Sequence, residues 1–311
     1  METKRYFNDI FDDETAMLSN PIGWNYGEAY RLLPRSIHGH RQAAQMPYLR
    51  ITLLEANGGV LHTVHSVKNT VSIVAVLQCD TAACLGDTKL KTGDLVVLDD
   101  KTKQLFFTAG SYRMIICNFD RNSFRSLTKL VAKHRGTVVD NGSANIASLV
   151  LPALETVAIS PDMLEHDAWV NDMRSALQAS IMQAYHHALP YRPKLTKGES
   201  YALEIRDRVY SRIEPTIAIK NFAKEYGVTE QTMQNAFKSL FGMTPYKFLR
   251  NLKLNHVRKE LLQAGPKKTT VVSVANKWGF THMGHFSGYY TQLFGENPSV
   301  TLQRTPDASD D

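Results

Sequence analysis

The pattern of apolar and polar positions divides the chain into a β-rich first part and a helical last part. Between about Tyr48 and Phe119, short runs such as 49–53 and 71–76 alternate apolar and polar residues, which is the period of a half-buried strand. Turn-forming pairs separate these runs at strand-length intervals: Asn57-Gly58, Gly86-Asp87 and Gly93-Asp94. We therefore predict a sandwich or small barrel of short strands.

The segment from Leu90 to Asp99 sharpens this prediction. It resembles the paired strands that flank the Gly-Asp turn of cupin-like barrels. We expect a cupin-like domain over residues 1–125, and an α+β fold for the chain as a whole.

Helical periodicity begins near Ser126. Residues 145–157 predict an apolar-striped helix that Pro152 interrupts early, and Pro161 opens a second helix that runs to about Leu189. Their apolar stripes lead us to expect a helical dimerisation segment over residues 126–190. The prolines at 190 and 193, with Gly198 shortly after, predict a linker over residues 191–200. Helices then continue to Leu302, and residues 305–311 form an acidic tail.

The last third contains two copies of one pattern, at residues 222–245 and 274–298. In each copy a small alanine is followed four residues later by a glycine suited to end a helix in the left-handed conformation. A second helix follows, with apolar residues at every fourth position: Met233, Phe237 and Phe241 in the first copy, Phe286, Tyr290 and Phe294 in the second. This is the pattern of a helix-turn-helix. The second copy holds one extra residue in its turn.

The segment between the copies predicts how they are spaced. Thr244 can cap a helix that has Pro245 at its first position and that ends before Gly265-Pro266. A helix of about 20 residues is about 30 Å long, close to the roughly 34–36 Å of one turn of B-DNA. The two second helices, about 229–241 and 282–294, would then enter successive major grooves. The alternative is a purely structural bundle whose two halves are alike by accident.

Composition and charge support a nucleic-acid partner. The 311 residues are 43% apolar, which suits a globular protein of about two domains. The net charge of the whole chain is +6. Residues 201–304 carry 15 basic and 7 acidic side chains, so their own surplus of positive charge exceeds that of the whole chain. The three cysteines show no metal-type spacing, and no signal peptide or membrane-length apolar run is visible. We expect a cytoplasmic protein with no membrane partner.

Residues 202–304 resemble the DNA-binding domain of the arabinose-regulator (AraC/XylS) family. Four stretches are most similar to the subgroup of the ethanolamine-utilisation regulator: 233–237, 254–261, 278–286 and 294–302. The resemblance implies a transcription activator that binds double-stranded promoter DNA and RNA polymerase. It also implies a homodimer whose N-terminal domain can hold a small-molecule effector.

The outward positions of the first recognition helix are the candidates for reading bases. Asparagine and glutamine can pair with both N6 and N7 of adenine, which favours Gln231, Gln234 and Asn235, with Thr232 beside them. Most family members carry arginine where Asn235 stands, so a guanine contact is not implied. In the second helix the base-reading candidates are His285 and Ser287, and His282 or Met283 could also reach DNA.

Other residues of this domain are candidates for contacts to the DNA backbone. Gly284 and Gly288 cannot read a base edge, so they either admit a close approach of the DNA backbone or simply pack. Ala218 stands where the family has a Ser/Thr cap, at a cost of about 1 kcal/mol, whereas Thr270 keeps the cap. The candidates for phosphate contacts are Lys220, Lys238, Lys247, Arg250, Lys253, Lys267, Lys268, Thr270 and His282.

Two other functions remain open at this stage. Cupin-like barrels also host metalloenzymes, but His62 and His65 lack the family's metal-binding arrangement, and no catalytic motif is present. We therefore expect no catalytic residue, metal or cofactor. A sequence-independent architectural DNA binder is the other alternative. An effector, if bound, could be lined by Arg50, His62, His65, Tyr112 and Arg113.

Overall fold

The computed structural model describes residues 5–304 except 14–15, 18–23, 35–36, 67, 82, 100–103, 135, 188–189, 215, 265 and 267; for residues 24–27, 65–66 and 99 it describes only the backbone. The chain forms two compact units. The first contains Met1–Ala29, Ile37–Gly58 and His62–Lys194, and the second contains Tyr30–Ser36, Gly59–Leu61 and the chain from Leu195 onward. The predicted acidic tail and Lys267 lie outside the described residues.

The β-strands form two antiparallel sheets, which confirms the predicted sandwich. Their bounds are β1 (Arg5–Phe11), β2 (Trp24–Arg31), β3 (Gly39–Met46), β4 (Leu49–Ala56), β5 (Val60–Ser66), β6 (Thr70–Cys79), β7 (Ala83–Leu85), β8 (Thr88–Leu90), β9 (Leu95–Asp99), β10 (Gln104–Thr108), β11 (Tyr112–Asp120) and β12 (Val138–Val139). The seven-stranded sheet has the order β1-β3-β4-β11-β6-β9-β12, and the five-stranded sheet has the order β2-β5-β10-β7-β8.

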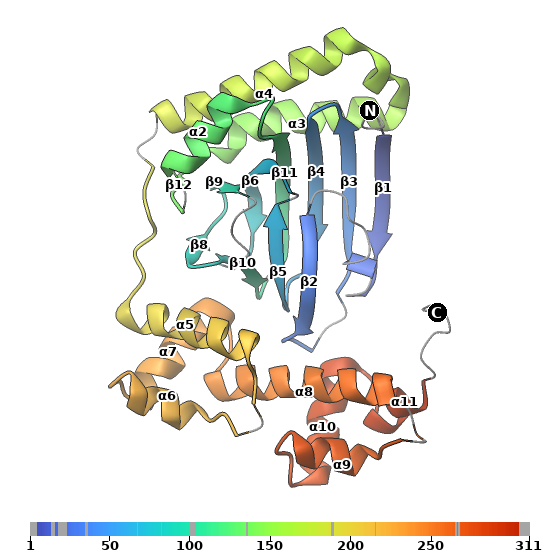
Figure 1. Cartoon of the computed structure of the whole chain (residues 1–311), viewed down its shortest axis with the longest axis vertical. Coiled ribbons are helices and arrows are strands. Elements are labelled where there is room, and N and C mark those ends of the chain that lie inside the picture. Colours follow the sequence, from blue (N-terminus) through green and yellow to red (C-terminus); the bar gives the residue numbers. More distant parts are fainter. Residues whose placement is uncertain are drawn as a thin grey trace. The chain divides into compact units, whose positions relative to one another are not determined.

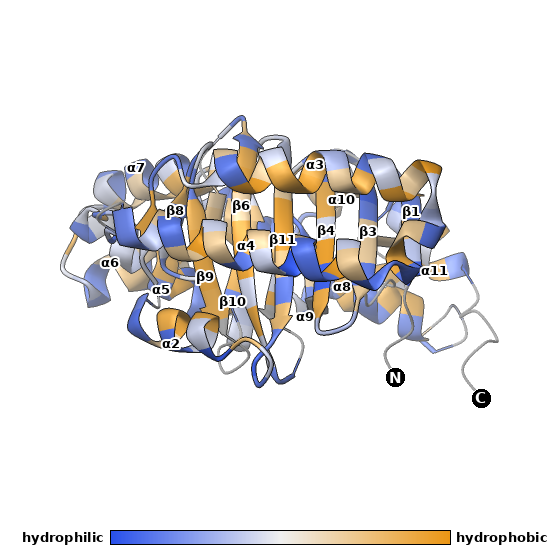
Figure 2. Ribbon diagram, turned by 90° about the horizontal axis from the view of Figure 1, so that it is seen from above, coloured by the Kyte–Doolittle hydropathy of each residue, from blue (hydrophilic) through white to orange (hydrophobic). Residues whose placement is uncertain are grey.

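Helices cover one face of the seven-stranded sheet (Figures 1 and 2). They are α2 (Arg125–His134), α3 (Ser143–Ile159), the short 3-10 helix η1 (Pro161–Glu165) and α4 (Asp167–His187). Their apolar stripes share one core with the alternate residues of the strands, Leu49, Ile51 and Leu53 among them. The apolar stripes that suggested dimerisation therefore largely pack against the sheet within the first unit. Dimerisation itself stays a prediction.

Three local predictions for this unit are wrong. Pro152 does not interrupt α3, which continues to Ile159. The proline and Ser148 are both exposed, so water can hydrate the Ser148 carbonyl that loses its helical partner. Pro161 opens a separate 3-10 turn rather than the long helix α4 itself. The segment from Leu90 to Asp99 is not a pair of neighbouring strands, because β8 pairs with β7 and β9 pairs with β6 in the other sheet.

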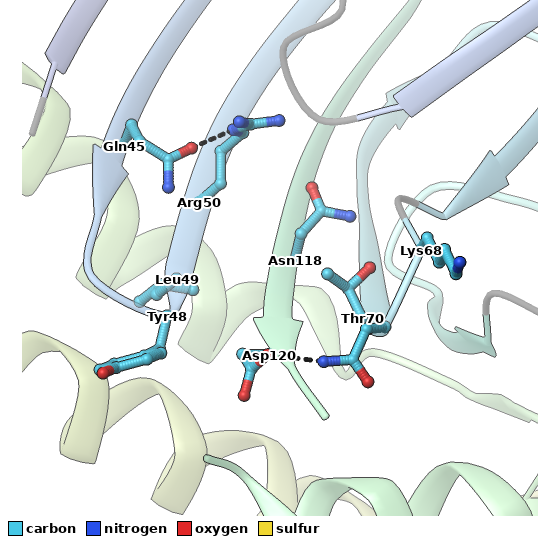
Figure 3. Close-up of a pocket in the computed structure, with 9 residues that line it drawn as sticks. Gln45, Tyr48, Leu49, Arg50, Lys68, Thr70, Asn118 and Asp120 are labelled. Carbon is cyan, nitrogen blue, oxygen red and sulfur yellow. Dashed lines mark hydrogen bonds between the residues drawn. The ribbon is translucent and has the colours of Figure 1, made fainter. Parts of the chain in front are cut away.

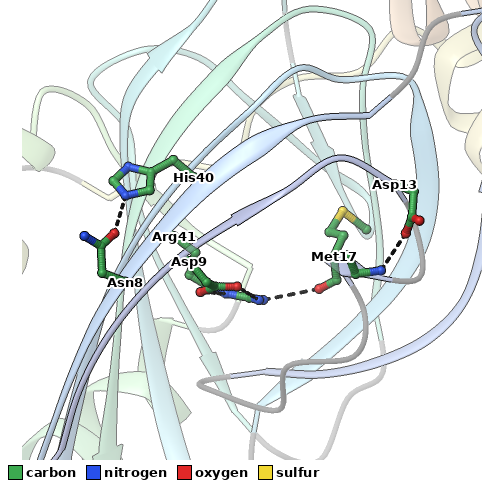
Figure 4. Close-up of polar contacts among 7 residues, drawn as sticks. Asn8, Asp9, Asp13, Met17, His40 and Arg41 are labelled. Atoms are coloured by element: carbon green, nitrogen blue, oxygen red, sulfur yellow. Dashed lines mark hydrogen bonds and ion pairs between the residues drawn. The ribbon is translucent and has the colours of Figure 1, made fainter.

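The alternation did not reveal strands β1–β3. An ion pair that is buried on its arginine side joins β1 to β3 (Figure 4). Arg41 on β3 is 1% exposed, and its guanidinium donates to both carboxylate oxygens of Asp9, at 3.1 and 2.5 Å. The two residues face each other in the strand register. A third bond runs from Arg41 to the carbonyl oxygen of Met17 at 3.2 Å. This long-range pair holds β1 on the sheet edge.

The second unit is built from helices α5 (Lys197–Ser211), α6 (Ile219–Glu225), α7 (Glu230–Phe241), α8 (Pro245–Ala264), α9 (Val271–Lys277), α10 (Met283–Phe294) and α11 (Pro298–Gln303). The predicted linker is too long at its end. Thr196 and Glu199 form a reciprocal capping box that starts α5 at Lys197, so Gly198 lies inside a helix. Gly198 lets α5 approach α7 closely, because a Cβ there would lie 3.2 Å from Thr232.

Helix α8 connects the two halves of this unit as predicted. Its start is capped by Thr244, whose hydroxyl accepts a bond from the Lys247 amide, and its 20 residues give a length of about 30 Å. Two asparagines on α8 also fix the segment 30–34 of the same unit. Asn251 donates to the Leu32 carbonyl at 2.7 Å, and Asn255 exchanges two bonds with the backbone of Arg31. The second unit is thus discontinuous in sequence.

Three further findings concern the described residues only. None of their helices is long and apolar enough to cross a membrane. No three of their His, Cys, Asp or Glu side chains gather in a way that could hold a metal ion. Cys79, Cys84 and Cys117 are free thiols, of which the last two are buried.

Candidate nucleic-acid interface

The first helix-turn-helix consists of α6 and α7. Its turn contains Gly227 with φ +62°, a left-handed conformation that glycine adopts without strain. The stripe Met233, Phe237 and Phe241 is completely buried, as predicted. Phe248 of α8 packs against both phenylalanines, with ring centroids 5.3 and 4.9 Å away. Ala236 and Leu240 join this buried face, whereas Gln231, Thr232, Asn235 and Lys238 are exposed on the other side of α7.

Two of the four base-reading candidates on α7 form a connected pair. Gln231 and Asn235 are exposed one turn apart, and the Gln231 amide donates to Oδ1 of Asn235 at 2.8 Å. A carbonyl oxygen has two lone pairs, so Asn235 keeps one acceptor site and its NH2 donors for an adenine edge. Gln234 is half-buried. Thr232 is turned back, because its hydroxyl lies 2.9 Å from that of Thr229, the residue that caps α7.

The second helix-turn-helix consists of α9 and α10. Gly279 in its turn has φ +81°, and the stripe Phe286, Tyr290 and Phe294 is buried. Trp278 attaches the motif to α8: its indole donates to Glu260 at 2.8 Å and its ring stacks on His256 at 4.7 Å. As predicted, Thr270 caps α9 through the Ser273 amide, whereas Ala218 provides no such bond at the start of α6.

The outward face of α10 is mostly backbone. Gly284 and Gly288 are exposed on the same side of the helix, and nothing lies within 4 Å of where a Cβ would stand on either. The structure therefore contradicts the alternative that these glycines simply pack. His282 and His285 are exposed beside them, and Ser287 is half-buried. Unlike α7, α10 has no side-chain cap, so its first backbone N–H groups have no side-chain acceptor.

Sequence reasoning missed Tyr289 on this face. The guanidinium of Arg250, from α8, stacks on the Tyr289 ring at 3.8 Å, a cation–π contact that holds both side chains in place. The ring of His285 also stacks with that of Tyr289, with the two ring centroids 6.2 Å apart. His285 and Tyr289 are four residues apart on one helix, which is the signal that could have revealed the pair. Arg250 comes from another helix, and no local pattern shows that.

The phosphate candidates are placed in different surroundings. Lys220, Lys238 and Lys268 are exposed, and Lys247 is half-buried. Lys253 is turned inward: its ammonium donates to the Ile217 carbonyl at 3.3 Å, and burial lowers its pKa. Arg250 is engaged with Tyr289, and Thr270 with its cap. The exposed lysines Lys220, Lys238 and Lys268 can therefore reach a phosphate with little rearrangement of the protein.

Of the candidate effector-lining residues, Arg50 lies at one cavity of the described residues, and Tyr112 and Arg113 lie at another. Arg50 lines a cavity of about 220 Å³ at one end of β4. Tyr112 and Arg113 line another, and Arg113 is paired there with Glu55. His62 is buried against Phe106, 5.4 Å between rings. The side chain of His65 lies outside the described residues.

Comparison with known proteins agrees with this geometry. A family model described as a helix-turn-helix domain matches residues 222–304. The chain is 30% identical over 151 residues to the "Probable thc operon regulatory protein" of Rhodococcus erythropolis, a match that covers 47% of this chain and 45% of that protein. It is 24% identical over 176 residues to the "XylDLEGF operon transcriptional activator" of Pseudomonas putida, covering 57% and 52%. The chain thus spans about half the length of these curated relatives.

Among solved structures, a "probable AraC family transcriptional regulator" from Rhodopseudomonas palustris CGA009 is 29% identical, covering 34% of this chain and 95% of that one, with a TM-score of 0.29. The two curated relatives are named as regulators of transcription. Both copies of the predicted motif fall within the matched residues. Residues 222–304 therefore form a helix-turn-helix domain that is similar to those of known regulators of transcription.

Proposed function

We propose that the whole chain is a sequence-specific transcription regulator that binds promoter DNA with α7 and α10 in successive major grooves. One observation carries the proposal: two helix-turn-helix motifs, each with its stripe buried and its opposite face exposed, stand at the two ends of the 20-residue helix α8. That length suits one turn of B-DNA.

Selection of binding sites from random-sequence DNA by the full chain tests this function. We expect enrichment of two short sequence blocks about 10–10.5 base pairs apart. Retained binding with no enriched sequence would instead favour the architectural DNA binder, whose affinity comes from phosphates alone. A stoichiometric metal in the purified protein would favour the metalloenzyme alternative.

We propose unequal roles for the two recognition helices. Helix α7 presents amide side chains that match adenine, so Gln231, Gln234 and Asn235 read sequence. Helix α10 presents two glycines and uncapped N–H groups, which suit a phosphate at a helix N-terminus. His285 and Ser287 add the only side chains of α10 that we assign to base contacts. The second motif then mainly positions the protein on the DNA.

Gly284 and Gly288 form what we name the glycine strip, and we propose that DNA comes close to it. Glycine destabilises a helix interior by about 1 kcal/mol relative to alanine. Nothing in the DNA-free unit requires either glycine, because a Cβ would meet open space at both positions. A bound DNA backbone would explain why glycine stands at both positions. The DNA could lie against the strip only if residues 284 and 288 have no side chains.

Replacing both glycines by alanine should therefore move stability and binding in opposite directions. We expect the unfolding free energy to rise by up to about 2 kcal/mol, about 1 kcal/mol for each glycine, while DNA affinity falls by about tenfold, or roughly 1.4 kcal/mol. Denaturant unfolding and fluorescence anisotropy with promoter DNA measure the two effects. Unchanged affinity in the more stable variant would contradict the close approach.

Lys238 should contribute through phosphates alone. Lys238→Ala removes an exposed cation near the end of α7, so specific and random DNA should lose affinity alike, and the slope of log K against log salt should fall by about 0.9. Lys129→Ala, an equally exposed lysine on α2, is the matched control and should change neither. A loss confined to the specific site would assign Lys238 to base reading instead.

The remaining parts of the proposal concern partners. We propose an activator that acts as a homodimer in the cytoplasm, contacts RNA polymerase and responds to a small molecule held by the first unit. The name of the Pseudomonas putida relative supports activation. Kinship with the ethanolamine-utilisation regulator rests on the four sequence stretches of the second unit alone, and mapping of bound promoters tests it.

A further inference from the structure

One cross-strand row of the seven-stranded sheet is polar where its neighbours are apolar. Gln45, Arg50, Asn118 and Ser72 are direct register partners on β3, β4, β11 and β6. The next row on the same face contains Ala43, Thr52, Ile116 and Val74. Both rows alternate with the residues that pack on the helices, so they face the opposite side, the interior of the sandwich.

This row is only partly satisfied by its own members. Nε of Arg50 donates to the side-chain oxygen of Gln45, and the Asn118 amide donates to the Ser72 hydroxyl at 2.6 Å. Oδ1 of Asn118 and the hydroxyl oxygen of Thr52 have no partner among the described residues, although these side chains are only 4% and 3% exposed. Buried acceptors are rarely left unpaired in a folded protein. A hydrogen-bond donor from a bound molecule would satisfy Asn118.

The polar row opens into the cavity of about 220 Å³ (Figure 3). Arg50 and Asn118 line it, and Lys68 stands exposed at its edge. Asp120 is the one acidic residue among the described residues that line the cavity. Both of its carboxylate oxygens are engaged: one accepts from Asn69 at 3.0 Å, the other from the amides of Asn122 and Ser123. Arg50 and Lys68 are the cationic residues among the described lining, and they favour a ligand that carries negative charge.

We propose that this cavity binds a small hydroxycarboxylic acid. Its carboxylate would lie on Arg50 and Lys68, since guanidinium and ammonium groups form charge-assisted hydrogen bonds with carboxylates. Its hydroxyl would donate to Oδ1 of Asn118. The cavity is smaller than the roughly 300–1,000 Å³ of sites for drug-sized ligands, so the acid has few carbon atoms. The role of this acid as effector rests on the proposed regulatory function; its binding does not.

Three matched probes test the assignment on the full chain by thermal unfolding without DNA. 3-Hydroxybutyrate carries both groups, butyrate lacks the hydroxyl, and 3-hydroxybutyramide lacks the charge. We expect 3-hydroxybutyrate to raise the melting temperature in a saturable way, butyrate to bind several-fold more weakly, and the amide to have no effect. An equal effect of the amide, or no effect of either acid, would overturn the proposal. Stabilisation by inorganic phosphate but by neither acid would also overturn the proposal.

Variants locate the effect. Arg50→Gln should weaken the binding of 3-hydroxybutyrate by about tenfold. Lys68→Gln changes an exposed residue and leaves the sheet intact, and it should weaken the binding several-fold. Arg113→Gln is the control, because Arg113 pairs with Glu55 outside this cavity. Wild-type binding by Lys68→Gln and Arg50→Gln together would refute the site. DNA binding is measured in parallel. If the wild-type chain binds DNA but does not bind 3-hydroxybutyrate, only this proposal is overturned and the proposed function stands.

Discussion

Phe237→Ala should lower the free energy of unfolding of the second unit by about 3–5 kcal/mol, the usual cost of deleting a buried phenylalanine. Phe237 is completely buried and stands between Phe241 and Phe248, with ring centroids 5.2 and 5.3 Å away. The substitution would leave a cavity where α7 rests on α8. Because that contact orients the recognition helix, we expect DNA binding to be lost as well.

Urea unfolding followed by circular dichroism measures this effect. Phe237→Leu keeps most of the volume and should cost much less, typically under about 1.5 kcal/mol. Tyr246, which is half-exposed at the start of α8 and bonds to Glu230 at 2.8 Å, offers a matched aromatic outside the core. Tyr246→Ala should cost about 1 kcal/mol. If Phe237→Ala cost no more than that, the stripe would not be the core of the motif.

Asn235→Ala should weaken binding to the selected DNA site by about 1–3 kcal/mol, or roughly 5- to 150-fold, and should barely change binding to random DNA. Asn235 is exposed, and its Oδ1 is oriented by the Gln231 amide at 2.8 Å. Its removal takes away a base contact together with a side chain that is already held in place. Stability should hardly change, since the residue contributes to no core.

Fluorescence anisotropy with both DNAs separates the two cases. Gln231→Ala should produce a smaller loss of the same kind, because it removes the residue that orients Asn235. Asn145→Ala, at an exposed position on α3 in the other unit, is the matched control. Equal losses on specific and random DNA would exclude base reading by Asn235.

Local patterns were sufficient to predict the second unit because its signals are short-range. Caps, left-handed glycines and the fourfold spacing of aromatic residues all act within one or two turns of helix. The capping box of Thr196 and Glu199 is equally local, and it corrects the predicted linker. What local patterns could not show is the pairing of Arg250 with Tyr289, since the two side chains come from different helices.

The first unit was harder to predict for a related reason. Strand β3 contains Arg41 at a completely buried position, which breaks the apolar alternation that marks a strand. Its partner Asp9 is remote in sequence, and the ion pair exists only once β1 has joined the sheet. The polar row of Gln45, Arg50, Asn118 and Ser72 is likewise assembled by strand register and cannot be seen in any one segment.

The glycine strip of α10 implies a trade-off between durability and activity. Both positions tolerate a methyl group in the free protein, and alanine would strengthen the helix at each. A laboratory search for heat-resistant variants would therefore favour alanine at 284 and 288. If DNA lies against the strip, those variants would survive heating yet no longer occupy their promoters, so thermal robustness would be a misleading guide when this regulator is engineered.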